Sequence, residues 1–85
     1  MIFAVCAVRD RAVNGYGQPI FVPHLGAAVR SFQDECNRAE SALHAHPEDY
    51  DLYSIGTFDD SNAKLEACEP VMLITGKQAV IRKPE

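Results

Sequence analysis

Hydrophobic residues recur at helical spacing between Leu25 and Leu43. Successive apolar positions are three or four residues apart, which places them on one stripe of an α-helix. Polar and charged residues occupy the other faces, so this helix needs a partner surface on one side only. Its start falls between His24 and Ala27, and Pro47 marks the break that follows its end. The stripe comprises Leu25, Val29, Phe32, Cys36, Ala39 and Leu43.

Five shorter segments have the residue types of β-strands. Residues 2–8 are apolar at every position, which is typical of a strand buried on both faces. Residues 20–22 form a short strand that we expect to make a hairpin with the first. Aromatic and β-branched residues then return in three later segments, the last of which we expect in the interior of the sheet. These are residues 50–58, 63–68 and 71–75.

Glycine and proline punctuate the second half of the chain. Gly56 indicates a bulge, or a close approach by a neighbouring strand, within residues 50–58. Pro70 separates the last two predicted strands, and Gly76 ends the final one. The tail, residues 77–85, is either a loose end or a strand that pairs on association.

This order of elements predicts an α+β fold. A single long helix packs on a small, mainly antiparallel sheet in the order strand, strand, helix, strand, strand, strand. The 85 residues make a single domain, 1–85. A chain of this size buries only about 60 to 65% of the surface that its unfolded form exposes. Because one helix covers only one face of the sheet, we expect a homodimer or a higher oligomer.

Composition narrows the class of protein. With 47% apolar and 24% charged residues, the chain is an ordinary globular protein. Its 12 acidic residues outnumber 8 basic ones, which argues against coating nucleic acid by bulk charge. The opening apolar run is too short to be a membrane anchor and lacks the basic region of a signal peptide. We therefore expect a cytoplasmic protein, with Cys6, Cys36 and Cys68 as reduced, buried hydrophobes.

Catalytic and metal-binding patterns are weak in this sequence. His44 and His46, near Glu48 and Asp49, lie at a helix end, where the helix dipole already accounts for histidine. The acidic groups have no calcium-loop spacing, and no glycine-rich phosphate loop is present. Cysteines in apolar segments make poor nucleophiles. We expect no enzyme, no cofactor and no metal.

Basic residues interleaved with aromatic ones are the remaining pattern. Single-stranded nucleic acid is held in this way, because bases stack on aromatic rings while cations follow the phosphates. Tyrosines in a small sheet are also common as half-buried packing residues, so the pattern alone leaves both interpretations open. The candidate nucleic-acid contacts are Arg9, Arg11, Tyr16, Arg30, Arg38, Lys77, Arg82 and Lys83.

Three segments carry a resemblance to a known family. They are residues 30–35 (RSFQDE), 47–53 (PEDYDLY) and 56–60 (GTFDD). Together with the apolar opening strand they resemble the small non-structural protein of gokushovirus-type microviruses, which are single-stranded DNA bacteriophages. The resemblance covers about Phe3 to Thr75. It implies a viral protein of the host bacterial cytoplasm, often described as DNA-binding, that acts in the switch from duplex replication to genome packaging, and it implies no catalytic residue.

The sequence thus supports two hypotheses. The first is a homodimeric accessory protein that binds single-stranded DNA. The alternative is a protein-interaction module that recruits a phage or host replication or assembly factor without binding DNA directly. Neither hypothesis involves a membrane.

Overall fold

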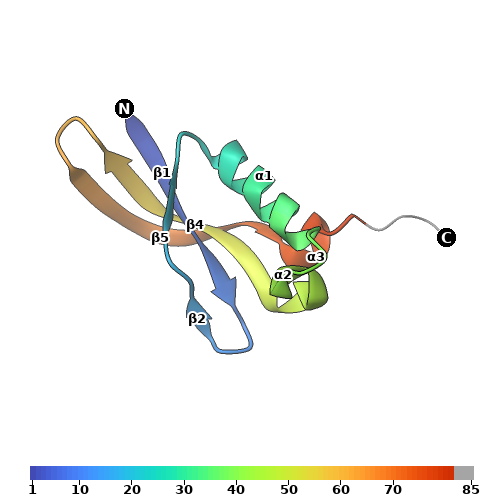
Figure 1. The fold of residues 1–85 in the computed structure, drawn as a ribbon. Helices are drawn as coiled ribbons and strands as arrows, with labels where there is room; N and C mark the ends of the chain where they lie inside the picture. The colour runs from blue at the N-terminus through green and yellow to red at the C-terminus, as the bar shows by residue number, and fades with distance from the viewer. Residues whose placement is uncertain (82–85) are drawn as a thin grey trace.

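The computed structural model of the chain describes residues 1–81 (Figure 1). Its centre is a five-stranded antiparallel sheet, in which β1 and β4 are interior strands. The elements, in chain order, are β1 (Ile2–Asp10), β2 (Gly15–Tyr16), β3 (Ile20–Val22), α1 (Leu25–Cys36), α2 (Ala42–Ala45), the 3₁₀ helix η1 (Pro47–Asp49), β4 (Tyr50–Asp59), β5 (Lys64–Thr75) and α3 (Gly76–Ala79).

β1 runs through the middle of the sheet because it is apolar on both faces. It pairs with β4 along its whole length, and with β2 and β3 on its other side. The consecutive residues Val5, Cys6 and Ala7 are all buried, so both faces of the strand are shielded from water at this point. The predicted strand and its antiparallel pairing with residues 20–22 are confirmed, but burial on both faces holds only at residues 5–7, because Ile2 is exposed and the remaining apolar residues are partly buried.

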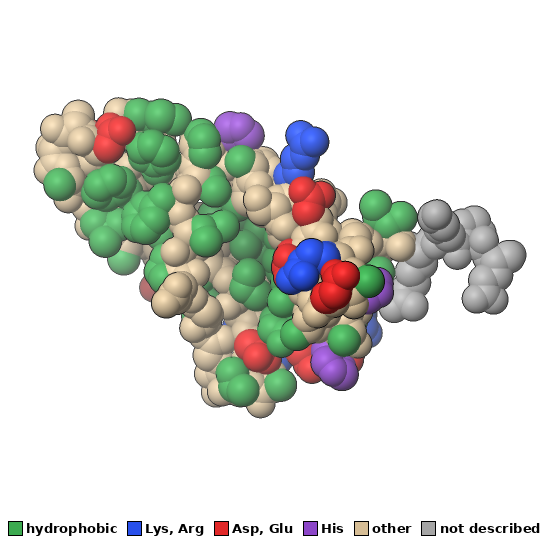
Figure 2. Space-filling model, viewed as in Figure 1, with side chains coloured by type: hydrophobic (Ala, Val, Ile, Leu, Met, Phe, Trp, Pro, Cys, Tyr) green, Lys and Arg blue, Asp and Glu red, His purple; other side chains and the backbone are tan. Residues whose placement is uncertain are grey.

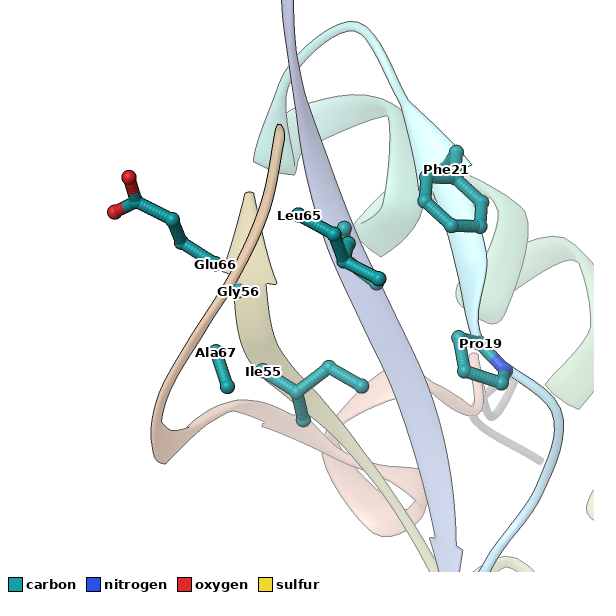
Figure 3. Close-up of a pocket in the computed structure, with 8 residues that line it drawn as sticks. Pro19, Phe21, Ile55, Gly56, Leu65, Glu66 and Ala67 are labelled. Carbon is teal, nitrogen blue, oxygen red and sulfur yellow. The ribbon is translucent and has the colours of Figure 1, made fainter. Parts of the chain in front are cut away.

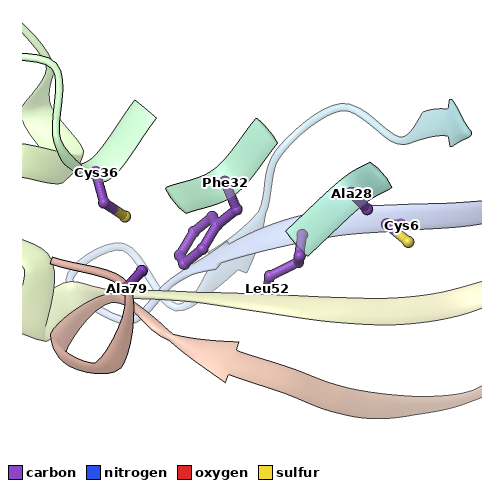
Figure 4. Packing of buried hydrophobic residues seen from close by; sticks show 6 residues of the cluster. All are labelled: Cys6, Ala28, Phe32, Cys36, Leu52 and Ala79. Atoms are coloured by element: carbon purple, nitrogen blue, oxygen red, sulfur yellow. The ribbon is translucent and has the colours of Figure 1, made fainter. Parts of the chain in front are cut away.

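α1 packs on one face of this sheet, as its apolar stripe predicts. The helix begins after His24, whose Nδ1 accepts a hydrogen bond from the backbone N–H of Ala27 at 3.1 Å. Its buried residues meet side chains of β1, β4 and α3 between the helix and the strands (Figure 4). The buried cluster comprises Cys6, Ala28, Phe32, Cys36, Leu52 and Ala79.

The prediction of a single long helix over residues 25–43 is wrong. α1 ends at Cys36, and the four-residue helix α2 follows separately. Asn37 ends α1 because its side-chain amide donates to the carbonyl oxygens of Gln33 (2.7 Å) and Ala79 (3.0 Å), in competition with continued helix. Ser41 then caps α2 by accepting from the N–H of Leu43. Leu43 still packs against the core, but from the second helix.

The predicted strands 63–68 and 71–75 form one strand, β5, so the predicted order of elements is also wrong. The register with β4 shifts between Ser54 and Gly56, opposite the stretch of β5 that contains Pro70. Proline is tolerated there because an edge strand at an irregularity does not need its N–H. Among the described strands β5 pairs with β4 alone, and Val71 is exposed. Residues 71–75 are therefore at an edge and not interior. Figure 1 shows the β4–β5 hairpin extending away from the helices.

The predicted features of Gly56 are both present. The register skips Ile55, so the bulge lies directly before Gly56, and a Cβ at Gly56 would collide with the carbonyl oxygen of Glu66 on β5. Only glycine allows the two strands to approach so closely.

The first part of the tail is a helix and not a strand. Thr75 and Gln78 form a capping box: the hydroxyl of Thr75 accepts from the N–H of Gln78 (3.1 Å), and the side chain of Gln78 accepts from the N–H of Thr75 (3.0 Å). Asn37 also accepts from the N–H of Ile81 at 2.8 Å, which ties the end of α3 to the end of α1. Residues 82–85 of the predicted tail lie outside the described residues.

Candidate nucleic-acid interface

The side chains of β1 alternate between the two faces of the sheet. Ala4, Cys6 and Val8 belong to, or pack against, the core under α1. Successive residues of a strand point to opposite faces, so the intervening positions project from the face opposite α1, which we call the second face. On β1 these positions are Phe3, Val5, Ala7 and Arg9.

Arg9, Tyr16 and Tyr53 meet at one end of the second face. The ring centroids of Tyr16 and Tyr53 are 5.5 Å apart in an edge-to-face arrangement, and the Arg9 guanidinium lies 6.0 Å from the Tyr16 centroid. Arg9 also donates to the side-chain oxygen of Asn14 at 2.8 Å, which fixes it over the β1–β2 turn. Tyr16 is 47% exposed. The site thus presents an accessible ring beside a cation.

The strand pairing creates this cluster. Arg9 lies directly opposite Tyr16 on β2, and Ala7, two residues earlier, lies opposite Tyr53 on β4. Residues on one face at such positions are close enough for aromatic side chains to touch. Tyr53 is not among the candidates drawn from the sequence. Its place in an apparent strand was visible, but its pairing with β1 was not.

Arg11 is also close to this end, but it is engaged in a structural ion pair. Its Nε and Nη2 donate to the two carboxylate oxygens of Asp51 at 2.8 and 2.9 Å. Asp51 is almost fully buried. The hydrogen bonds that Arg11 donates to Asp51 raise the pKa of the guanidinium above its ordinary value. Arg11 therefore positions the turn rather than offering a free charge.

The other predicted contacts do not join this cluster. Arg30 is exposed on α1, on the opposite side of the sheet, and no ion pair involves it within residues 1–81. Arg38 follows α1 and makes a two-point pair with Glu35, whose pKa it lowers to about 2. Lys77 is exposed on α3. Arg82 and Lys83 lie outside the described residues.

The far end of the second face is apolar. Phe21 contacts Phe58 edge to face, with centroids 5.5 Å apart, and Phe3 lies 6.5 Å from Phe58. Leu65 of β5 completes a groove with these three rings. In Figure 3, Phe21 and Leu65 border the adjoining hollow, whereas the carboxylate of Glu66 points away from it. Figure 2 shows hydrophobic side chains gathered at the end of the molecule where the β4–β5 hairpin projects. This surface was not predicted from the sequence.

One group of residues has metal-ligand chemistry. His46, Glu48 and Asp49 place ligand atoms within 4.8 Å of one another, and His46 Nδ1 lies 3.8 Å from a carboxylate oxygen of Glu48. His46 and Glu48 are exposed, and none of the three is held by a buried partner that would orient it as a ligand. His44, the neighbouring histidine, lies instead 3.0 Å from the carbonyl oxygen of Cys36. The group does not by itself indicate a metal centre.

The cysteines divide into two kinds. Burial raises the pKa of the Cys6 and Cys36 thiols, which makes both poor nucleophiles at neutral pH. Cys68 is exposed, so its predicted burial is wrong. It lies two residues before Pro70, in the irregular part of β5 that has no paired residue on β4.

Comparison with known proteins identifies a family. Residues 3–79 match the family model described as "Phage ORF5 protein". Neither the curated proteins nor the solved structures yielded a match. No helix within residues 1–81 is both long enough and apolar enough to cross a membrane.

Proposed function

The chain belongs to the Phage ORF5 protein family, and from this premise we propose that it is a phage accessory protein that binds single-stranded DNA at the Arg9 end of the second face. The observation that carries the proposal is the contact between Arg9, Tyr16 and Tyr53. The rings offer a stacking surface, and the guanidinium offers a phosphate partner beside it.

The geometry favours an unpaired strand over a duplex. A half-exposed tyrosine ring stacks on a base only when the face of that base is free, as it is in single-stranded DNA. The rings are edge to face, so Tyr53 buttresses Tyr16 rather than competing with it for the same base. Arg9 is itself held by Asn14, which lowers the entropic cost of fixing it against a phosphate.

The charge balance sets the expected strength of binding. The chain has a formal net charge of −4, and Arg11 and Arg38 are already paired with carboxylates. Few phosphates are therefore neutralised per chain, and the affinity is modest. It falls as salt rises, since counterion release contributes a slope of about −0.7 per phosphate contact on single strands.

A titration with a fluorescently labelled oligonucleotide tests the proposal. At low salt the anisotropy should rise with a dissociation constant in the micromolar range, about 1 to 50 µM, and the rise should shrink as salt is added. A competing unlabelled duplex should displace the probe less well than a competing single strand. An unchanged anisotropy over that concentration range would contradict the proposal.

The biological setting of this proposal is a microvirus of the gokushovirus type. There the protein works in the cytoplasm of the infected bacterium, in genome replication or in the switch to packaging single strands. A protein that holds newly displaced single strands with modest affinity suits such a switch, because packaging must later remove it.

A second candidate rests on the dispersal of the basic residues. Arg30 on α1 and Arg9 on the second face lie on opposite sides of the sheet, and Arg38 is neutralised by Glu35. Such a distribution suits an interaction module that recruits a phage or host replication factor. Recovery of a protein partner from infected cells, together with a failed oligonucleotide titration, would favour it over DNA binding.

A further inference from the structure

We infer that Asn14 is a site of deamidation, in which the backbone nitrogen of Gly15 attacks the side-chain amide of Asn14 and a carboxylate forms beside Arg9. Asn14 and Gly15 are adjacent where the turn after β1 enters β2. The reaction needs water and no enzyme, and water reaches this turn because Asn14 is exposed. The effect on DNA binding rests on the proposed function, whereas the modification itself does not.

The chemistry exchanges an amide for an imide and then for an acid. The N–H of Gly15 loses its proton to solvent base, and the nitrogen forms a bond to Cγ of Asn14. The bond between Cγ and Nδ2 breaks, and Nδ2 takes up a proton from water and leaves as ammonia. Water then opens the cyclic imide at either carbonyl, which leaves an aspartate or an isoaspartate at position 14. In sum, a neutral amide and water become a carboxylate and an ammonium ion.

The residue that follows each asparagine decides how easily its amide is attacked. Gly15 has no side chain to shield its nitrogen, whereas an arginine follows Asn37 and an alanine follows Asn62. The amide of Asn37 is also held in place, because it donates to two backbone carbonyl oxygens. Of the three asparagines in the chain, Asn14 is therefore the one that should react fastest.

The fold leaves the atoms of this turn free to react. A Cβ at Gly15 would meet no atom within 4 Å, so the space around this residue is open. β2 is only two residues long, and among the described strands it pairs with β1 alone. Such a short pairing opens locally at little cost, because few contacts hold it. Cγ of Asn14 can then reach the nitrogen of Gly15 without unfolding of the sheet.

Arg9 favours the reaction and pairs with its product. Its Nη2 donates to Oδ1 of Asn14 at 2.8 Å, and no hydrogen bond within residues 1–81 holds Nδ2, the leaving atom. A cation at the amide oxygen stabilises the negative charge that develops there during the attack. The carboxylate of the product then forms a charge-assisted pair with the guanidinium. Arg9 paired in this way no longer offers a free charge to a phosphate.

Peptide mapping by mass spectrometry tests the modification. The full chain is aged in mildly alkaline buffer at physiological temperature and is then digested with trypsin. Cleavage after arginine and lysine puts the three asparagines in separate peptides, residues 12–30, 31–38 and 39–64. The first peptide should gain the mass difference between an amide and an acid at least about tenfold faster than the other two.

Two glycine variants separate the attack on Asn14 from a general effect of ageing. Gly15→Ala should slow the conversion about tenfold, because the methyl group shields the nitrogen while the fold has room for it. Gly17→Ala is the matched control, since this glycine follows no asparagine and its Cβ would make only an ordinary contact with the Val8 carbonyl oxygen. Neither glycine has a positive φ, so alanine fits both positions. Equal conversion of the three peptides would overturn the inference, and so would a Gly15→Ala chain that reacts as fast as the wild type.

The consequence for DNA is measured on the same material. Ion exchange separates the aged chains, which carry an additional negative charge, and oligonucleotide anisotropy compares them with unmodified chains. The aged chains should bind about tenfold more weakly, and Asn14→Asp should weaken binding in the same direction. Equal binding of aged and unmodified chains would contradict the predicted pairing with Arg9. If neither binds, the proposed function is wrong, and the peptide map still decides whether Asn14 reacts.

Discussion

Arg11 and Asp51 join the turn after β1 to the start of β4 through two parallel hydrogen bonds of 2.8 and 2.9 Å. The carboxylate is buried, whereas half of the arginine side chain is exposed. The pair holds the residues that precede β2 in place, and β2 carries Tyr16. The position of the proposed DNA contact therefore depends on an ion pair that does not touch DNA.

Removal of the guanidinium should destabilise the protein. Arg11→Met keeps much of the apolar stem but leaves the buried carboxylate of Asp51 without its two donors, so the urea midpoint should fall. Arg38→Met is the matched control, because its partner Glu35 is at the surface and exposed ion pairs contribute little. Equal midpoints for the two variants would show that the Asp51 pair has no special structural role.

Two glycines allow a second stability test. A Cβ at Gly76 would collide with the carbonyl oxygens of Pro47 and Tyr50, whereas a Cβ at Gly15 would meet no atom within 4 Å. Gly76→Ala should therefore lower the free energy of unfolding by about 2 kcal/mol or more, because α3 has to move away from η1. Gly15→Ala should change it by less than about 0.5 kcal/mol. A tolerated Gly76→Ala would mean that α3 does not dock as described.

The pairing of Glu35 with Arg38 should make a small part of the stability depend on pH in the acid range, because both side chains are exposed and solvent screens the pair. The folded state lowers the pKa of Glu35 from 4.5 to about 2, chiefly through the hydrogen bonds from Arg38. A lowered folded-state pKa stabilises the protein above 4.5, and this contribution is lost as the pH falls from 4.5 towards 2. Urea midpoints measured across this range should fall less steeply for Glu35→Gln than for the wild type. Identical slopes would contradict the assignment.

The fold was predictable where local pattern and tertiary packing agree. The strand of residues 2–8 follows from its continuous apolar run, and the helix that begins near His24 follows from apolar periodicity. Both elements are present, although only residues 5–7 of the strand are buried. Gly56 likewise indicated the bulge that lies beside it and the close approach of β5.

The predictions of secondary structure are wrong where a single side chain, and not the hydrophobic pattern, determines where an element ends. Asn37 ends α1 because its amide reaches the carbonyl oxygen of Ala79, 42 residues away, which no local reading reveals. Pro70 was expected to separate two strands. It lies within one strand, because the N–H that proline lacks is not needed for pairing at an irregular edge position. Thr75 and Gln78 form a capping box at the start of α3. Both residue types were present in the sequence, but Thr75 was assigned to the end of the apolar strand before it, so the helix was not predicted.

The candidate site was predictable only in part. Arg9 and Tyr16 were identified from residue type, and the strand register brings them together. Arg30, Arg38 and Lys77 share that chemistry but lie on other elements. The place of Tyr53 and the apolar groove of Phe3, Phe21, Phe58 and Leu65 depend on which strands are neighbours, and that is a long-range property of the chain.

The central claim is that single-stranded DNA binds at the Arg9 end of the sheet, and oligonucleotide anisotropy on paired arginine variants tests it most directly. Arg9→Ala removes the cation beside Tyr16, and Arg30→Ala removes an exposed cation from the opposite side of the sheet. We predict that Arg9→Ala weakens binding by about tenfold, because it removes one charge-assisted contact between the guanidinium beside Tyr16 and a phosphate. Arg30→Ala should bind as tightly as the wild type does. Equal affinities for the two variants, whether both weakened or both unchanged, would contradict the account.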